Sequence, residues 1–141
     1  MLDKRKYVDT LIKNFWKLGY MTVKRKFGTY LPEPERVGGF DIDVIARQKD
    51  DYAIGITLTT EDLNNPHLLE KLTFLATRHT KFTNRSVQLF AGVPSHQVRK
   101  VRMLIENLED EVKKNIKIIS LADTEIPSIR RKRRREKTFF T

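Results

Sequence analysis

Apolar residues recur at helical spacing in three stretches of this chain. The first runs from Leu2 to Leu18, where the lysines occupy the other positions of the helical wheel and Gly19 follows as a C-cap. The second runs from Pro66 to Lys81, and its inner stripe consists of Leu68, Leu72, Leu75, Ala76 and His79. The third starts at Pro94 and keeps a three-four spacing through Val98, Val101, Ile105, Leu108 and Val112. The pattern predicts three amphipathic helices.

Five shorter runs rich in apolar and β-branched residues predict strands, at 20–27, 39–46, 52–59, 86–93 and 116–121. The charged turn from Arg47 to Asp51 joins the second and third runs as a hairpin. A helical crossover joins the third and fourth runs, so we expect these two strands to be parallel. The elements predict an α/β fold with a mixed sheet of about five strands, flanked by helices on both faces, in the order αβββαβαβ.

The second predicted strand carries two carboxylates, Asp41 and Asp43, inside an apolar run. Period-two alternation places them with Ile45 on one face, and places Phe40, Ile42, Val44 and Ala46 on the other. A carboxylate in mid-strand is costly to bury unless a partner compensates it. One interpretation puts both carboxylates on a solvated face. The other puts them in a cleft where they hold, or once held, a divalent metal.

Composition narrows the class of protein. The 141 residues suit one domain, residues 1–122, followed by a basic tail at 123–141. The chain has no cysteine, which excludes disulfides and thiolate metal sites. No run is long enough to span a membrane and no signal peptide opens the chain, so we expect a cytoplasmic protein without a membrane partner. The formal charge is +10, of which the run Arg130 to Lys137 contributes +6, and this balance favours a nucleic acid as partner.

From Tyr7 to Leu121 the order of elements resembles the PD-(D/E)XK (restriction-endonuclease-like) nuclease superfamily, and archaeal Holliday-junction resolvases most closely. Leu18-Gly19-Tyr20-Met21-Thr22-Val23 is similar to that family's passage from first helix to first strand. Asp43-Val44-Ile45-Ala46 resembles its Asp-apolar-apolar-Ala signature. Ile54-Gly55-Ile56-Thr57 stands where the family has apolar-Glu-apolar-Lys.

The resemblance implies a catalytic centre at Asp43, Asp41, Gly55 and Thr57, and it implies that this centre is degenerate. In the family, Asp and Glu bind a divalent metal and Lys activates the attacking water. Here Asp43 is retained, Gly55 supplies no ligand and Thr57 supplies no charge. Asp41 and Asp43 would form at most a weak Mg²⁺ site. Residues that could compensate are Asp9, Asp41, Glu61 and Lys71.

The leading hypothesis is a nucleic-acid-binding protein, inactive or impaired as a nuclease and without a cofactor. The expected phosphate contacts are Lys24, Lys26, Arg99, Lys100, Arg102, Arg130, Arg131, Lys132, Arg133, Arg134 and Arg135. The partner would be DNA, with RNA also open, and resemblance to resolvases implies a homodimer. Phe139 and Phe140 resemble the aromatic end of a sliding-clamp-binding peptide. The alternatives are an active Mg²⁺-dependent DNA endonuclease that uses Asp41 or Asp43, and a protein-interaction scaffold without catalysis.

Overall fold

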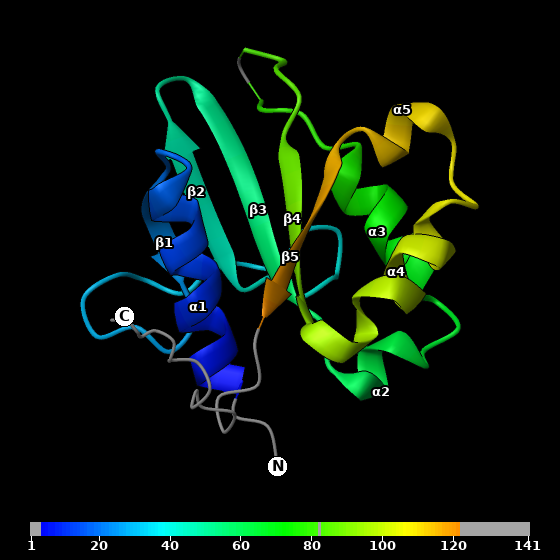
Figure 1. The fold of residues 1–141 in the computed structure, drawn as a ribbon. Helices are drawn as coiled ribbons and strands as arrows, with labels where there is room; N and C mark the ends of the chain where they lie inside the picture. The colour runs from blue at the N-terminus through cyan, green and yellow to red at the C-terminus, as the bar shows by residue number, and fades with distance from the viewer. Residues whose placement is uncertain (1–3, 82, 122–141) are drawn as a thin grey trace, which may run out of the picture.

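A five-stranded mixed sheet forms the centre of the molecule (Figure 1). The computed structural model describes residues 4–81 and 83–121. The strands lie side by side in chain order: β1 (Met21–Arg25), β2 (Val44–Gln48), β3 (Asp51–Thr57), β4 (Gln88–Pro94) and β5 (Ile116–Leu121). The first three are antiparallel neighbours, whereas β3, β4 and β5 run parallel to one another. The predicted mixed α/β sheet and the parallel pairing across the crossover are confirmed.

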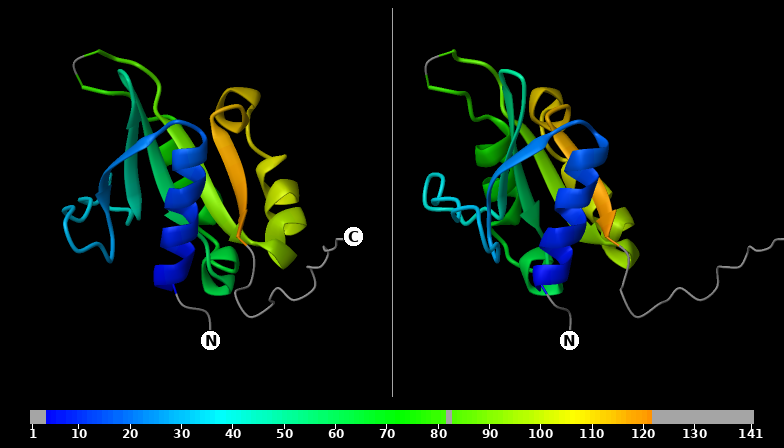
Figure 2. Two further views of the ribbon diagram at one scale, coloured as in Figure 1. Left: turned by 60° about the vertical axis from the view of Figure 1, so that its left-hand side comes forward. Right: turned by 90° about the vertical axis from the view of Figure 1, so that its left-hand side faces the viewer.

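Helices cover both faces of this sheet (Figure 2), as the sequence predicts. Among the described elements, helix α1 (Lys4–Lys17) is the one helix on the first face, where Val8, Leu11, Ile12 and Phe15 meet Val44, Ala46, Ala53 and Phe90. The opposite face carries α2 (Thr60–Leu63), α3 (Leu68–Ala76), α4 (Val98–Ile105) and α5 (Asp110–Lys113) over a larger apolar core. The sheet is therefore buried between two helical layers, one thin and one thick.

Two of the three predicted helices are shorter than expected. The third is divided into a 3₁₀ turn at Ser95–Gln97, α4 and α5, and the extended Glu109 (φ −67°, ψ 153°) precedes α5. Val101, Ile105 and Val112 still face one core, so the apolar stripe continues across the break. The second helix ends at Ala76, and the predicted place of His79 on its inner stripe is wrong: His79 is exposed and forms an isolated bridge with Ser86.

The hairpin begins later than predicted, and this shift positions Asp43. Strand β2 starts at Val44, and Asp43 lies in a bend just before it. Ile42 packs with Ile45 in the core beneath α3 and α4, whereas Val44 and Ala46 face α1. The predicted alternation, with Ile42 and Val44 on one face, is wrong because the bend at Asp43 interrupts the period of two.

No helix within residues 4–81 and 83–121 combines the length and apolar character needed to cross a membrane. The predicted basic tail, with Arg130 to Arg135 and the pair Phe139 and Phe140, lies outside the described residues.

Candidate functional site

Strands β3, β4 and β5 end on the side of the sheet where α1 begins (Figure 1), and Asp43 is bonded there to Thr57, the last residue of β3. The backbone of Asp43 is fixed from both sides. The Asp43 N–H donates to the Gly55 carbonyl at 2.9 Å, and the Lys26 N–H donates to the Asp43 carbonyl at 2.9 Å. These bonds tie the bend before β2 to β3 and to the end of β1.

The Asp43 carboxylate is enclosed, with only 2% of the residue exposed. Its Oδ2 accepts hydrogen bonds from the Thr57 N–H at 2.7 Å and from the Thr57 hydroxyl at 3.0 Å. Its Oδ1 is buried without a hydrogen-bond partner among the described residues, but Lys4 Nζ and Lys26 Nζ lie 3.6 and 3.8 Å away. Two donors and two ammonium groups thus compensate the burial of this charge.

A third lysine approaches from the other helical layer. Burial of Lys71 on α3 lowers the pKa of its ammonium group below the usual 10.5, and the negative charges of Asp62 and Asp43 partly oppose this shift. Lys4 and Lys26 are partly accessible, with 38% and 23% of their side chains exposed. The surroundings of Asp43 therefore supply ammonium groups rather than further carboxylates.

Gly55 leaves no room for a side chain. A Cβ atom there would stand 2.8 Å from Cε2 of Phe15 and 3.0 Å from Cδ2 of Leu11. Phe15 is itself fixed, because its ring packs edge-on against Tyr20 and Phe90 and is 1% exposed. Thr57 and Asp43 meet as the resemblance implies. Gly55 faces the side of the sheet that α1 covers, but it meets closed core rather than an open cleft.

Asp41 occupies different surroundings. It is exposed, and its carboxylate accepts a hydrogen bond from Arg36 Nε at 3.0 Å. That hydrogen bond is the main reason why the pKa of the Asp41 carboxyl lies below its usual value. Asp41 lines a small cavity of about 180 Å³ with Asp62, His67 and Lys71, and Asp43 does not line it. The structure thus places Asp41 on the solvated face of the first interpretation, and Asp43 on neither a solvated face nor an open cleft.

The other two acidic residues considered as compensating ligands, Asp9 and Glu61, are respectively bonded to another residue and exposed to solvent. Asp9 is bonded to Arg25 at 2.5 Å, and Glu61 is exposed on α2. Asp62 accepts from the Thr59 N–H and hydroxyl in a capping box at the start of α2. Within residues 4–81 and 83–121, no group of three or more His, Cys, Asp or Glu side chains could hold a metal ion.

The predicted nucleic-acid contacts separate into two groups. Lys24 and Lys26 belong to the segment formed by α1, β1 and their flanks, residues 4–27. This basic segment holds eight Lys or Arg residues against the single acidic residue Asp9. Arg99, Lys100 and Arg102 are exposed on α4, across the sheet from α1. The lysines of α1 were not among the predicted phosphate contacts, although a charge count over residues 4–27 singles them out.

Comparison of the chain with family models, with curated proteins and with solved structures gave no match. The class of the protein is therefore described from its fold and its site alone. The residues that the structure describes form an α/β fold with a mixed five-stranded sheet, the enclosed Asp43 carboxylate flanked by lysines, and the basic segment.

Proposed function

We propose that the chain is a nucleic-acid-binding protein with a restriction-endonuclease-like core and a degenerate catalytic centre. The observation that carries the proposal is the charge of the basic segment, residues 4–27, where eight basic residues face a single acidic one. A layer of this charge attracts phosphate backbones over a distance of about 10 Å at moderate salt. Within the segment Asp9 is bonded to Arg25, and Lys4 and Lys26 lie beside the Asp43 carboxylate.

The geometry around Asp43 supports the absence of catalysis. Mg²⁺ requires several oxygen ligands, and phosphodiester hydrolysis needs the metal together with an activated water. The Asp43 carboxylate is instead engaged by Thr57 and flanked by two ammonium groups. Gly55, where the family has its second carboxylate, is closed by Phe15 and Leu11.

One observation favours the alternative of a Mg²⁺-dependent endonuclease. Asp43 Oδ1 is buried without a hydrogen-bond partner among the described residues, and such an atom normally has one. A hydrated Mg²⁺ could occupy its vicinity if Lys4 and Lys26 moved away. This alternative would require ligands from the nucleic acid or from water, because Asp43 contributes only one carboxylate.

Two assays separate the functions: gel-shift titration of DNA and of RNA in chelator, and cleavage assays of the same substrates with Mg²⁺ and Mn²⁺. The proposal predicts binding in chelator and no metal-dependent cleavage. Robust cleavage that Asp43→Ala abolishes would establish the endonuclease instead. An absence of binding at low salt would leave the scaffold as the remaining hypothesis.

A matched pair of variants tests which face binds. Lys13→Gln with Lys17→Gln removes two exposed charges from α1. Lys113→Gln with Lys114→Gln removes two charges that pair with Glu106, Asp110 and Glu111 near α5. Both double variants have the same net charge. The first should weaken binding and reduce the salt slope by about one unit per lost phosphate contact, whereas the second should change neither. Equal effects would mean that net charge alone drives binding and that no face is selected.

A further inference from the structure

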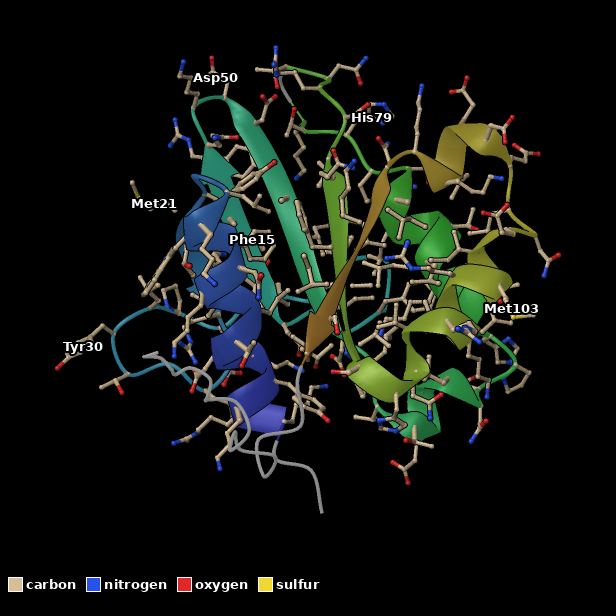
Figure 3. All side chains as sticks on the ribbon, in the orientation of Figure 1. Phe15, Met21, Tyr30, Asp50, His79 and Met103 are labelled. Carbon is tan, nitrogen blue, oxygen red and sulfur yellow. The ribbon has the colours of Figure 1, made fainter. Side chains whose placement is uncertain are left out.

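Exposed apolar side chains gather on the same layer as the positive charge. Six of the seven large hydrophobic residues that are exposed in the described part of the chain fall between residues 16 and 31: Trp16, Leu18, Met21, Phe27, Tyr30 and Leu31. Tyr30 is 95% exposed and Trp16 is 61% exposed. Met21 and Tyr30 project from one side of the molecule, and the seventh residue, Met103, lies on the opposite side (Figure 3). Such a concentration of apolar surface marks an interaction site.

Four of these six side chains line a groove of about 390 Å³ between α1, β1 and the loop that follows β1, namely Trp16, Phe27, Tyr30 and Leu31. Three aromatic rings, Trp16, Phe27 and Tyr30, line it together with Arg5 and Arg25. The Arg5 guanidinium lies 5.8 Å from the centroid of the Phe27 ring. Flat rings and guanidinium planes in one groove are the surfaces on which unpaired nucleobases stack.

Hydrogen bonds within the groove fix the residues that line it. Arg25 Nη2 is bonded to Asp9 Oδ1 at 2.5 Å, and Arg25 Nε donates to the Lys26 carbonyl at 3.1 Å. The backbone N–H of Arg25 donates to the carbonyl of Pro32 at 3.0 Å, which closes the loop carrying Phe27 and Tyr30. The guanidinium plane and the loop are thus fixed in place before any ligand arrives.

We propose that this groove binds single-stranded nucleic acid by stacking bases on Trp16, Phe27 and Tyr30. Lysines of the basic segment, such as Lys13, Lys17 and Lys24, would hold the phosphates beside it. The inference rests on the proposed function and adds the form of nucleic acid that is bound. Charge complementarity selects this occupant over a second copy of the chain, because two copies facing through this layer would each present eight basic residues and one acidic residue.

Trp16 provides the test, because it is the one tryptophan in the chain. The full-length protein is titrated at low salt with an oligothymidylate of about ten nucleotides, with an abasic oligomer of the same length, and with a DNA duplex. Stacking predicts that oligothymidylate quenches Trp16 emission and that the abasic oligomer quenches less and binds about 5- to 100-fold more weakly. Tyr30→Ala should weaken oligothymidylate binding by a similar factor with an unchanged salt slope. Met103→Ala, which truncates an exposed apolar residue on α4, should leave binding unchanged.

Each other outcome overturns the inference in a distinguishable way. If oligothymidylate binds while Trp16 emission is unchanged and Tyr30→Ala binds like the parent, the groove is not the base-binding site, although the proposed function stands. If none of the three ligands binds, the proposed function fails as well. If Trp16 emission shifts with protein concentration alone and sedimentation shows a dimer that Tyr30→Ala disrupts, a second copy occupies the groove. Circular dichroism and the thermal midpoint of each variant verify that it is folded.

Discussion

Replacing Gly55 with alanine tests whether this position is closed. The added Cβ would lie 2.8 Å from Cε2 of Phe15 and 3.0 Å from Cδ2 of Leu11, and both of these side chains are buried. Overpacking of a core in this way costs about 1–3 kcal/mol, and loss of glycine's freedom in the unfolded chain returns about 0.4–1 kcal/mol. We expect Gly55→Ala to lower the free energy of unfolding by about 1–2 kcal/mol, which corresponds to a fall in Tm of about 2–8 °C.

Urea and thermal denaturation followed by circular dichroism measure this change, and a second substitution identifies its cause. Phe15→Leu removes Cε2 of Phe15, the nearer of the two atoms that the new Cβ would meet. Gly55→Ala should therefore cost less in the Phe15→Leu background than in the parent, and the double-mutant cycle should show the coupling. If Gly55→Ala is as stable as the parent, the side chains of α1 move aside at this position and a carboxylate side chain could fit there. That result would refute the steric part of the argument against catalysis.

Three further predictions concern the charge network and the tail. Thr57→Val should lower the free energy of unfolding by about 1–2 kcal/mol, because Asp43 Oδ2 loses its hydroxyl donor. Thr57→Ser should keep most of the stability, and urea denaturation measures both variants. Equal stability of Thr57→Val and the parent would show that the hydroxyl contributes nothing. The pKa of Lys71 is lowered in the fold, so the unfolded chain binds more protons between that pKa and 10.5, and stability should rise with pH in this range. That rise should be smaller in Lys71→Met, and identical pH profiles would contradict it. Deleting residues 130–141 should weaken DNA binding and flatten its salt dependence, whereas an unchanged affinity and slope would exclude the tail as a contact.

The architecture could be predicted where the hydrophobic pattern of a single segment was strong enough to define a helix or a strand. The apolar stripe of the first helix and the β-branched runs of the strands give the sheet, its two helical layers and the parallel crossover. The division between α4 and α5 could not be predicted, because the stripe from Val98 to Val112 continues across it. The bend at Asp43 was also missed, because it depends on how the preceding loop is tied to Lys26 and Gly55.

The candidate site was predicted in part. Its position at Asp43 and the proximity of Thr57 were expected from the resemblance, and the structure brings those two residues together. The approach of Lys4 and Lys26 to Asp43 could not be read from the sequence, because it joins the start of α1 to the end of β1 through tertiary structure. The steric closure of Gly55 by Phe15 is a contact of the same long-range kind.

We propose above that the basic segment, residues 4–27, binds nucleic acid without a metal. The most direct measurement is the equilibrium affinity for a labelled DNA oligomer in excess chelator, titrated against salt, with the Lys13→Gln and Lys17→Gln double variant beside the parent. We expect tight binding in chelator, a logarithm of affinity that falls linearly with the logarithm of salt, and a shallower slope for the double variant. Binding that appears only when Mg²⁺ is added, or a slope that the double variant leaves unchanged, would contradict it.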